Sequence, residues 1–227
     1  MADVEAAKRA AAKTAVANHY PKDARWVGIG SGTTIVYVIE AIKALGVDTS
    51  ATRYLIVTAG LTAVEFDSLP EGIMLDVAFD GADEVDDKLN CIKGGGACLF
   101  QEKLVAMQAK EFICVAGANW KYIPIEVAPI AAFRVLRKLK ELGANLDAKQ
   151  GPLKTDQGFF LVDAPFPPML TKSDVQAGKV SGQDGIWEVT ELSEKIKSTA
   201  GVLDVGIFSG LTGPQATAAG GVGAQGL

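Results

Sequence analysis

The chain has 227 residues, enough for one large domain or two modest ones. Hydrophobic residues make up 48% and charged residues 22%, which is typical of a globular protein with an ordinary core. The net charge of −5 and the lack of a basic stripe argue against nucleic acid as the main partner, and no apolar run reaches the length of a transmembrane helix.

Few residues are available for metal or nucleophilic chemistry. The three cysteines, Cys91, Cys98 and Cys114, are odd in number and form no CxxC pair, which is typical of reduced thiols in a cytoplasmic protein. The only histidine, His19, ends the first predicted helix, and we expect a surface or capping role for it. We therefore expect no histidine-based metal site, and the acidic N-terminus does not resemble a signal peptide.

Strands and helices alternate over the first half of the chain. Helices are predicted at 4–18, 33–45, 59–68 and 96–110, and strands at 25–29, 54–57, 73–79 and 112–116. The strands are continuously apolar, as in a parallel sheet that is covered on both faces. We therefore expect an α/β fold with a Rossmann-like parallel sheet flanked by helices.

The pattern changes after Pro124. A helix is predicted at 131–142, a strand at 158–163, a second helix at 191–198 and a last strand at 202–208. This predicts a smaller α+β, ferredoxin-like domain over 129–201, which would supply oligomer contacts. The main domain would take in residues 1–128 and 202–227, and we expect the last strand to return to the main sheet.

The first candidate binding loop is Gly28-Ile29-Gly30-Ser31-Gly32-Thr33-Thr34. It follows a strand and opens a helix, where free N–H groups and the helix dipole can hold an anion. Its spacing is GxGxG without a Walker lysine, which favours a single phosphate or a sugar hydroxyl over NAD or ATP. A tight turn whose Ser and Thr cap the helix explains the loop equally well.

The second candidate loop is acidic and spans Asp80–Asp87. Most such runs are solvated turns, and the spacing does not match an EF-hand. Asp80, however, directly follows an apolar strand, where a carboxylate can accept hydrogen bonds from sugar hydroxyls or move protons. We assign Asp80 and Asp83 to a site, and Glu84, Asp86 and Asp87 to solvent.

The third candidate segment spans Lys93–Lys103 and opens with three glycines, Gly94, Gly95 and Gly96. In a helix, Glu102 would have only apolar neighbours one turn away, so its carboxylate would lose solvation and become a better proton acceptor. Lys103 has equally apolar neighbours, so burial alone does not select Glu102 over a structural Glu-Lys pair. Lys93 could place its ammonium beside an oxyanion, or it could be an ordinary surface lysine.

Taken together, these segments resemble the ribose-5-phosphate isomerases of type A. The resemblance rests on four blocks in the same order, with Val202–Phe208 similar to the closing strand of the family. The blocks are Gly28–Thr34, Asp80–Asp86 (DGADEVD), Lys93–Lys103 (KGGGACLFQEK) and Ile123–Val127 (IPIEV). The segment between Val115 and Ile123 is shorter than the usual family pattern.

The resemblance implies interconversion of ribose 5-phosphate and ribulose 5-phosphate without metal or organic cofactor. Glu102 would be the base, and Lys93 with the Gly94–Gly96 backbone would stabilise an enediolate. Asp80 and Asp83 would serve ring opening and hydroxyl binding. The substrate-binding residues would further include those of the two loops and two lysines near the phosphate: Lys8, Ser31, Gly32, Thr33, Thr34, Gly81, Ala82 and Lys121.

Other functions remain open at this point. Amino-sugar phosphate deaminases and CoA transferases have related folds, and a sugar-phosphate-sensing module is a non-enzymatic alternative. The distant His19 disfavours a deaminase, and the lack of a basic DNA-binding segment disfavours a sensor fused to a regulator. We expect a cytoplasmic homodimer or dimer of dimers whose partner is a small sugar phosphate, with neither nucleic acid nor membrane.

Overall fold

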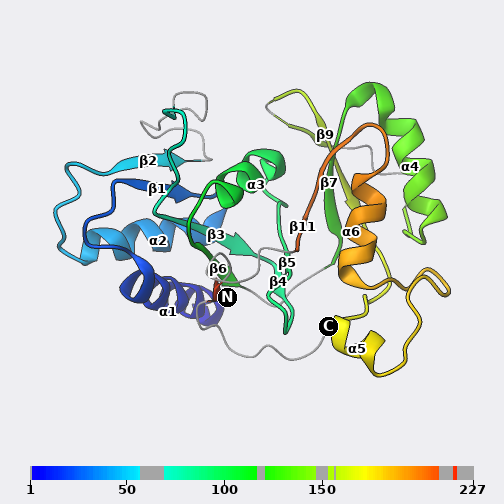
Figure 1. Ribbon diagram of the computed structural model, residues 1–227, viewed down its shortest axis with the longest axis horizontal. Coiled ribbons are helices and arrows are strands. Elements are labelled where there is room, and N and C mark those ends of the chain that lie inside the picture. The colour runs from blue at the N-terminus through cyan, green and yellow to red at the C-terminus, as the bar shows by residue number, and fades with distance from the viewer. Residues whose placement is uncertain are drawn as a thin grey trace.

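The computed structural model describes residues 2–56, 69–116, 121–146, 153–155, 157–209 and 217–218. They form a parallel sheet with its helices, a second antiparallel sheet with its own helices, and a small sheet near their junction (Figure 1). The helix predicted at 59–68 lies outside the described residues.

The main sheet has the strand order β12-β6-β3-β1-β2, and every pairing in it is parallel. This confirms the predicted parallel α/β sheet. Its strands are β1 (Trp26–Ile29), β2 (Arg53–Ile56), β3 (Val77–Ala82), β6 (Phe112–Ala116) and β12 (Thr217–Ala218).

Helices cover both faces of the main sheet, which explains its continuously apolar strands. Along β3, Val77 and Phe79 pack with helices α1 (Ala2–His19) and α2 (Thr33–Ala44). Ala78, which points to the opposite face, packs with helix α3 (Leu99–Met107). Figure 1 shows α1 and α2 on one side of the sheet and α3 on the other. None of the helices in the described part of the chain is long and apolar enough to cross a membrane.

The second sheet has the strand order β10-β7-β9-β8 and is antiparallel throughout. Its strands are β7 (Ile123–Val127), β8 (Leu153–Lys154), β9 (Phe160–Ala164) and β10 (Val202–Val205). Its core includes residues of two helices, α4 (Ala132–Glu141) and α6 (Val189–Lys197). The remaining short elements are the 3-10 turn η2 (Pro129–Ala131) and the helix α5 (Lys172–Gln176).

The expectation that the strand at 202–208 returns to the main sheet is wrong. A break at Gly206 divides it into β10, which pairs with β7, and β11 (Ile207–Phe208), which pairs with β5 (Cys91–Ile92). Both β7 and β10 thus pair within the second sheet, although the predicted boundaries place them in the main domain. Of the described residues after 201, only β12 joins the main sheet. The division of the chain into two domains stays a prediction.

A small sheet with the order β11-β5-β4 links the two units and fixes the segment before the glycines. It consists of β4 (Glu84–Val85), β5 and β11. Gly206 donates its N–H to Pro124 O at 2.7 Å and accepts the Lys93 N–H at 2.9 Å. The backbone of Lys93 is therefore tied to β7 through a single residue.

Replacing Gly206 with alanine should destabilise the protein by about 1–3 kcal/mol, the usual cost of overpacking a core. An added Cβ would lie 2.4 Å from Lys93 O and 2.8 Å from Pro124 O, and backbone atoms cannot move aside cheaply. The free energy of unfolding in urea measures the effect. Gly95→Ala is the control, because a Cβ there would meet nothing closer than Asp83 Oδ2 at 4.0 Å. Equal stability of the two variants would contradict the close approach at Gly206.

Candidate active site

The predicted site residues converge on one cavity of about 570 Å³ at the carboxyl ends of β1 and β3. Every predicted site residue except Lys121 lines it: Lys8, Ser31, Gly32, Thr33, Thr34, Asp80, Gly81, Ala82, Asp83, Lys93, Gly94, Gly95, Gly96 and Glu102. Four apolar residues that the sequence analysis missed complete the wall: Val4, Ala7, Ala11 and Ala116. Three of them share a helical face with Lys8, so their spacing could have revealed them.

A buried lysine lies between two buried carboxylates at this cavity. Lys93 Nζ lies 2.6 Å from Asp80 Oδ2 and also forms an ion pair with Glu102 Oε2. The three side chains are only 2–3% exposed. Lys93 also lies 4.8 Å from the ring centroid of Phe208, a cation–π contact. Lys93 is therefore no surface lysine, and Asp80 belongs to strand β3 rather than to a turn.

Burial and charge act in opposite directions on these groups. Burial alone would lower the pKa of Lys93, but Asp80 and Glu102 more than offset it and raise that pKa. Burial raises the pKa of Asp80 to about 7, although Lys93 opposes the shift. The pKa of Asp83 is also raised, chiefly by partial burial. Near neutral pH the site therefore combines a charged lysine with a carboxyl group, that of Asp80, which is close to its own pKa.

A hydrogen bond from Ser31 orients the Glu102 carboxylate, and two glycines allow the chain to approach closely at this site. Ser31 Oγ, from the first loop, donates a hydrogen bond to Glu102 Oε1. A Cβ on Gly96 would lie 2.7 Å from Ser31 Oγ, and one on Gly30 would lie 2.0 Å from Asp80. Glycine at position 30 therefore lets the first loop approach Asp80, and glycine at position 96 lets the glycine segment approach Ser31, which binds Glu102.

The structure also separates Glu102 from Lys103, which the sequence could not do. Glu102 lines the cavity, whereas Lys103 Nζ binds Asp204 Oδ1 at 2.6 Å and the carbonyl oxygens of Val205 and Ile207 at 2.6 and 3.2 Å. Lys103 therefore joins α3 to the second unit and does not face the cavity.

A second cation lies at another part of the same cavity. Lys8 Nζ of α1 donates a hydrogen bond to Thr33 Oγ1 at 3.1 Å. Thr33 is the first residue of α2, whose N-cap residue is Gly32 with φ of 92° and no side-chain cap. A helix N-terminus beside a lysine is a favourable place for a phosphate group.

The acids that the sequence analysis assigned to solvent are not all exposed in the structure. Asp86 is buried rather than solvated. Its carboxylate accepts hydrogen bonds from Lys88 N and from both nitrogens of Asn90, which replace those that water would donate. It closes the turn between β4 and β5. Lys121 is exposed and is not among the residues that line the cavity. Glu84 is half-buried, and only Asp87 of the three acids assigned to solvent is well exposed.

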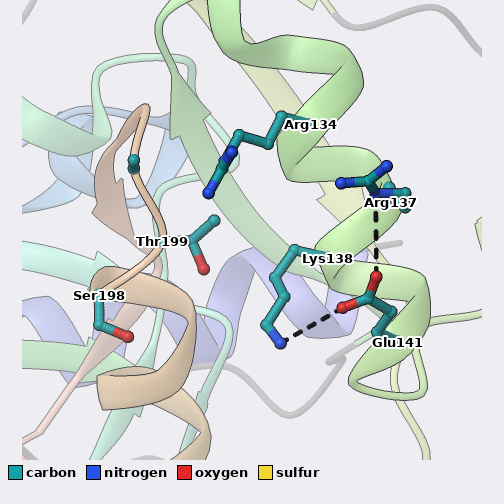
Figure 2. A pocket seen from close by; sticks show the side chains of 7 residues that line it. Arg134, Arg137, Lys138, Glu141, Ser198 and Thr199 are labelled. Atoms are coloured by element: carbon teal, nitrogen blue, oxygen red, sulfur yellow. Dashed lines mark hydrogen bonds and ion pairs between the residues drawn. The ribbon is translucent and has the colours of Figure 1, made fainter.

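A second hollow of about 370 Å³ lies on the helices of the second sheet (Figure 2). Arg137 and Lys138 there pair with Glu141 at 3.8 and 3.3 Å. None of the side chains that line this hollow is buried, so the hollow has nothing like the buried carboxylates and lysine of the first cavity. Within the described residues, no group of His, Cys, Asp and Glu side chains is arranged to hold a metal ion.

A parallel α/β sheet with two buried carboxylates and a lysine beside a helix N-terminus is typical of an enzyme that acts on a small phosphorylated molecule. Comparison with known proteins gives the particular family. The sequence model described as ribose 5-phosphate isomerase A (phosphoriboisomerase A) matches residues 45–220. The chain belongs to this family.

Curated relatives and solved structures agree with the family model. Ribose-5-phosphate isomerase of Mycosarcoma maydis is 42% identical, with 92% of this chain and 76% of the relative aligned. The Candida albicans enzyme is 41% identical over 92% and 90%. The structure of ribose 5 phosphate isomerase A from Neisseria gonorrhoeae has a TM-score of 0.71 and 26% identity, covering 96% of this chain and 94% of that one. Another D-ribose-5-phosphate isomerase, in complex with phospho-erythronic acid, has a TM-score of 0.69 and 28% identity over 91% of both chains.

The shifted pKa of Asp80 predicts a pH-dependent difference in stability between the wild type and Asp80→Asn. The folded protein holds the Asp80 proton up to about pH 7, whereas the unfolded chain releases it near 3.8. The contribution of Asp80 to stability is therefore complete below about pH 4 and is lost as the pH rises through about 7. Asparagine does not titrate, so the free energy of unfolding of the variant should rise relative to wild type over this range.

Urea unfolding at a series of pH values measures this difference. In the wild type, Lys93 stays charged throughout this range because its pKa is raised. A difference between the two proteins that is constant from about pH 4 to 7 would contradict the shift assigned to Asp80.

Proposed function

We propose that this chain interconverts ribose 5-phosphate and ribulose 5-phosphate through an enediolate, with Glu102 as the base. The observation that carries the proposal is the buried Asp80–Lys93–Glu102 cluster, which lines the same cavity as Lys8. Such a cavity offers a base, a cation for an oxyanion and a separate place for a phosphate. The family membership of the chain supports the same reaction.

Glu102 would act on the open-chain sugar. Its carboxylate removes the proton from C2, and the electron pair left behind forms the double bond between C1 and C2 while the carbonyl oxygen becomes negative. The same carboxyl group returns the proton to C1, and the hydroxyl proton at C2 is transferred to the oxygen at C1. The hydrogen bond from Ser31 holds one carboxylate oxygen and leaves the orientation of the base fixed between the two steps.

Lys93 would stabilise the charge that Glu102 creates. Its pKa is raised by Asp80 and Glu102, so the ammonium remains charged at neutral pH. A cation that is already held in place in a site from which water is largely excluded stabilises an oxyanion without reorganisation. Gly94–Gly96 line the same cavity, and their backbone N–H groups would be further donors to the oxyanion.

Asp80 and Asp83 would handle the hydroxyl groups and the ring. The pKa of Asp80 is raised to about 7, so it can donate a proton to the ring oxygen near neutral pH and accept one afterwards. Asp83 belongs to the same cavity wall but is more exposed, which suits hydrogen bonding to a substrate hydroxyl.

The assembly and location of the protein belong to the same proposal. Ile130 of η2 and Phe133 of α4 are 99% and 80% exposed, which supports a homodimer or dimer of dimers. The odd number of cysteines without a CxxC pair supports a reducing, cytoplasmic location.

Lys121 remains a candidate phosphate ligand only if the substrate reaches beyond the cavity described above.

Glu102→Gln should lower kcat by about 100-fold to 10,000-fold, the usual contribution of a general base. KM should change little, because the amide has the same shape and the phosphate contacts lie elsewhere. Steady-state kinetics with ribose 5-phosphate measure both constants. Glu40→Gln, an exposed carboxylate on α2, is the matched control and should behave like the wild type. Near-normal turnover of Glu102→Gln would rule out Glu102 as the base.

Lys8→Met should raise KM by about tenfold with a much smaller change in kcat, because a charged hydrogen bond to phosphate is worth about 1.5–3 kcal/mol. Competitive inhibition by inorganic phosphate should weaken in parallel. The control is Lys13→Met, which removes an exposed lysine of the same helix that does not line the cavity. If both variants bound phosphate as the wild type does, Lys8 would not hold that group.

A further inference from the structure

The helix that carries Glu102 starts without a good local cap. Helix α3 begins at Leu99, and its N-cap residue is Cys98, which is not one of the residue types that cap helices well. The first N–H groups of a helix have no partner within the helix and need an acceptor from elsewhere. Ala97, just before the cap, has a φ of 64°, so the chain enters the helix through a tight turn.

The missing acceptor comes from the second sheet. Glu126, next to the last residue of β7, accepts the N–H of Phe100 through Oε2 at 2.9 Å. Glu126 is 1% exposed, and the side chain of Thr155 also hydrogen bonds to its carboxylate. A carboxylate in this position both satisfies the N–H and interacts favourably with the positive end of the helix.

A second buried carboxylate holds the same helix from the neighbouring strand. Asp204 of β10 lies directly opposite Glu126 in the antiparallel pairing, and it binds Lys103. Two like charges at directly opposed positions destabilise a sheet, and burial makes this worse. Each carboxylate is matched instead by a group of α3, one on either side of Glu102 in the sequence.

We propose that Glu126 is a positioning residue for the base, resting on the proposed role of Glu102. Phe100 lies two residues before Glu102 in the first turn of α3. The hydrogen bond from Phe100 to Glu126 therefore fixes how far that turn lies from β7 and how it is rotated about the helix axis. The position of this turn of the helix sets the two distances from the Glu102 carboxylate, one to Ser31 and one to Lys93. The second sheet therefore holds the base in register with a cavity built mainly on the first.

The test compares Glu126→Ala with the wild type at a temperature where circular dichroism shows both to be folded. Turnover is measured with ribose 5-phosphate and with the same substrate deuterated at C2. The proposal predicts kcat lower by about tenfold to 100-fold, KM within about threefold, and a larger isotope effect on kcat, because misplacing a base slows proton transfer selectively. Glu126→Gln, which keeps an acceptor oxygen, should recover most of the loss.

Glu188→Ala is the matched control. Glu188 is also a buried glutamate at a helix N-terminus, where it accepts the N–H groups of Thr190 and Glu191 of α6, but it lies outside the cavity. Its loss should lower stability and leave kcat and the isotope effect unchanged. If Glu126→Ala does not fold, Glu126→Asp takes its place, since it keeps the charge but withdraws the oxygen by one methylene.

Two results would overturn the positioning role while leaving the base intact. The first is a folded Glu126 variant with wild-type kcat and isotope effect, in a preparation series where Glu102→Gln is inactive. The second is an equal loss of kcat in Glu188→Ala, which would show that turnover follows stability rather than position. Full activity of Glu102→Gln would instead remove the base itself and, with it, this inference.

Discussion

A charged lysine held between two carboxylates, out of contact with solvent, is the constraint on which the rest of this structure depends. Removing three charged groups from water costs several kcal/mol per ion, which close pairing offsets only in part. Lys93 makes ion pairs with Asp80 and Glu102, and the three groups carry one net negative charge when both acids are ionised. Such a cluster is poor at stabilising a fold. It is well suited to a reaction in which a proton leaves carbon and negative charge appears beside it.

The surrounding elements can be understood as supports for this cluster. Strand β3 presents Asp80, the small sheet positions Lys93, and helix α3 presents Glu102. These elements can approach closely because glycines in the loops, such as Gly30 and Gly96, have no side chain that would clash with the neighbouring segment. The second sheet then holds α3 from the far side through Glu126 and through Asp204, which binds Lys103. The two units are thereby joined at the helix that carries the proposed base.

Much of this arrangement could be predicted from the sequence, for physical reasons. Continuously apolar strands alternating with helices specify a parallel sheet, and acids or glycines directly after such strands must lie near one edge of it. The first loop, Asp80 and the glycine segment are therefore expected at one edge of the sheet, and all three line the same cavity. The choice of Glu102 over Lys103 came from the family resemblance, because both residues have apolar neighbours in the helix. Only the tertiary contacts of Lys103 separate them physically.

The errors have two causes: pairing between distant segments, and a short turn whose hydrogen bonds the sequence pattern does not indicate. Nothing local in residues 202–208 indicates that a break at Gly206 sends one half to β7 and the other to β5. Asp86 resembles a solvated acid until Asn90 folds back to donate to it. The role expected for Lys121 stays a prediction, and the side chain of this residue is exposed. The cap that Glu126 provides for α3 spans 26 positions and has no local signature.

In the proposed mechanism Glu102 moves a proton between C2 and C1, and this proton can exchange with solvent while the carboxyl group holds it. Turnover of ribose 5-phosphate in D₂O, followed by NMR of the product and the remaining substrate, tests it most directly. We expect deuterium to appear at C1 of ribulose 5-phosphate and, over repeated turnover, at C2 of ribose 5-phosphate. Complete retention of the original hydrogen through many turnovers would point to a hydride shift and would contradict the enediolate mechanism.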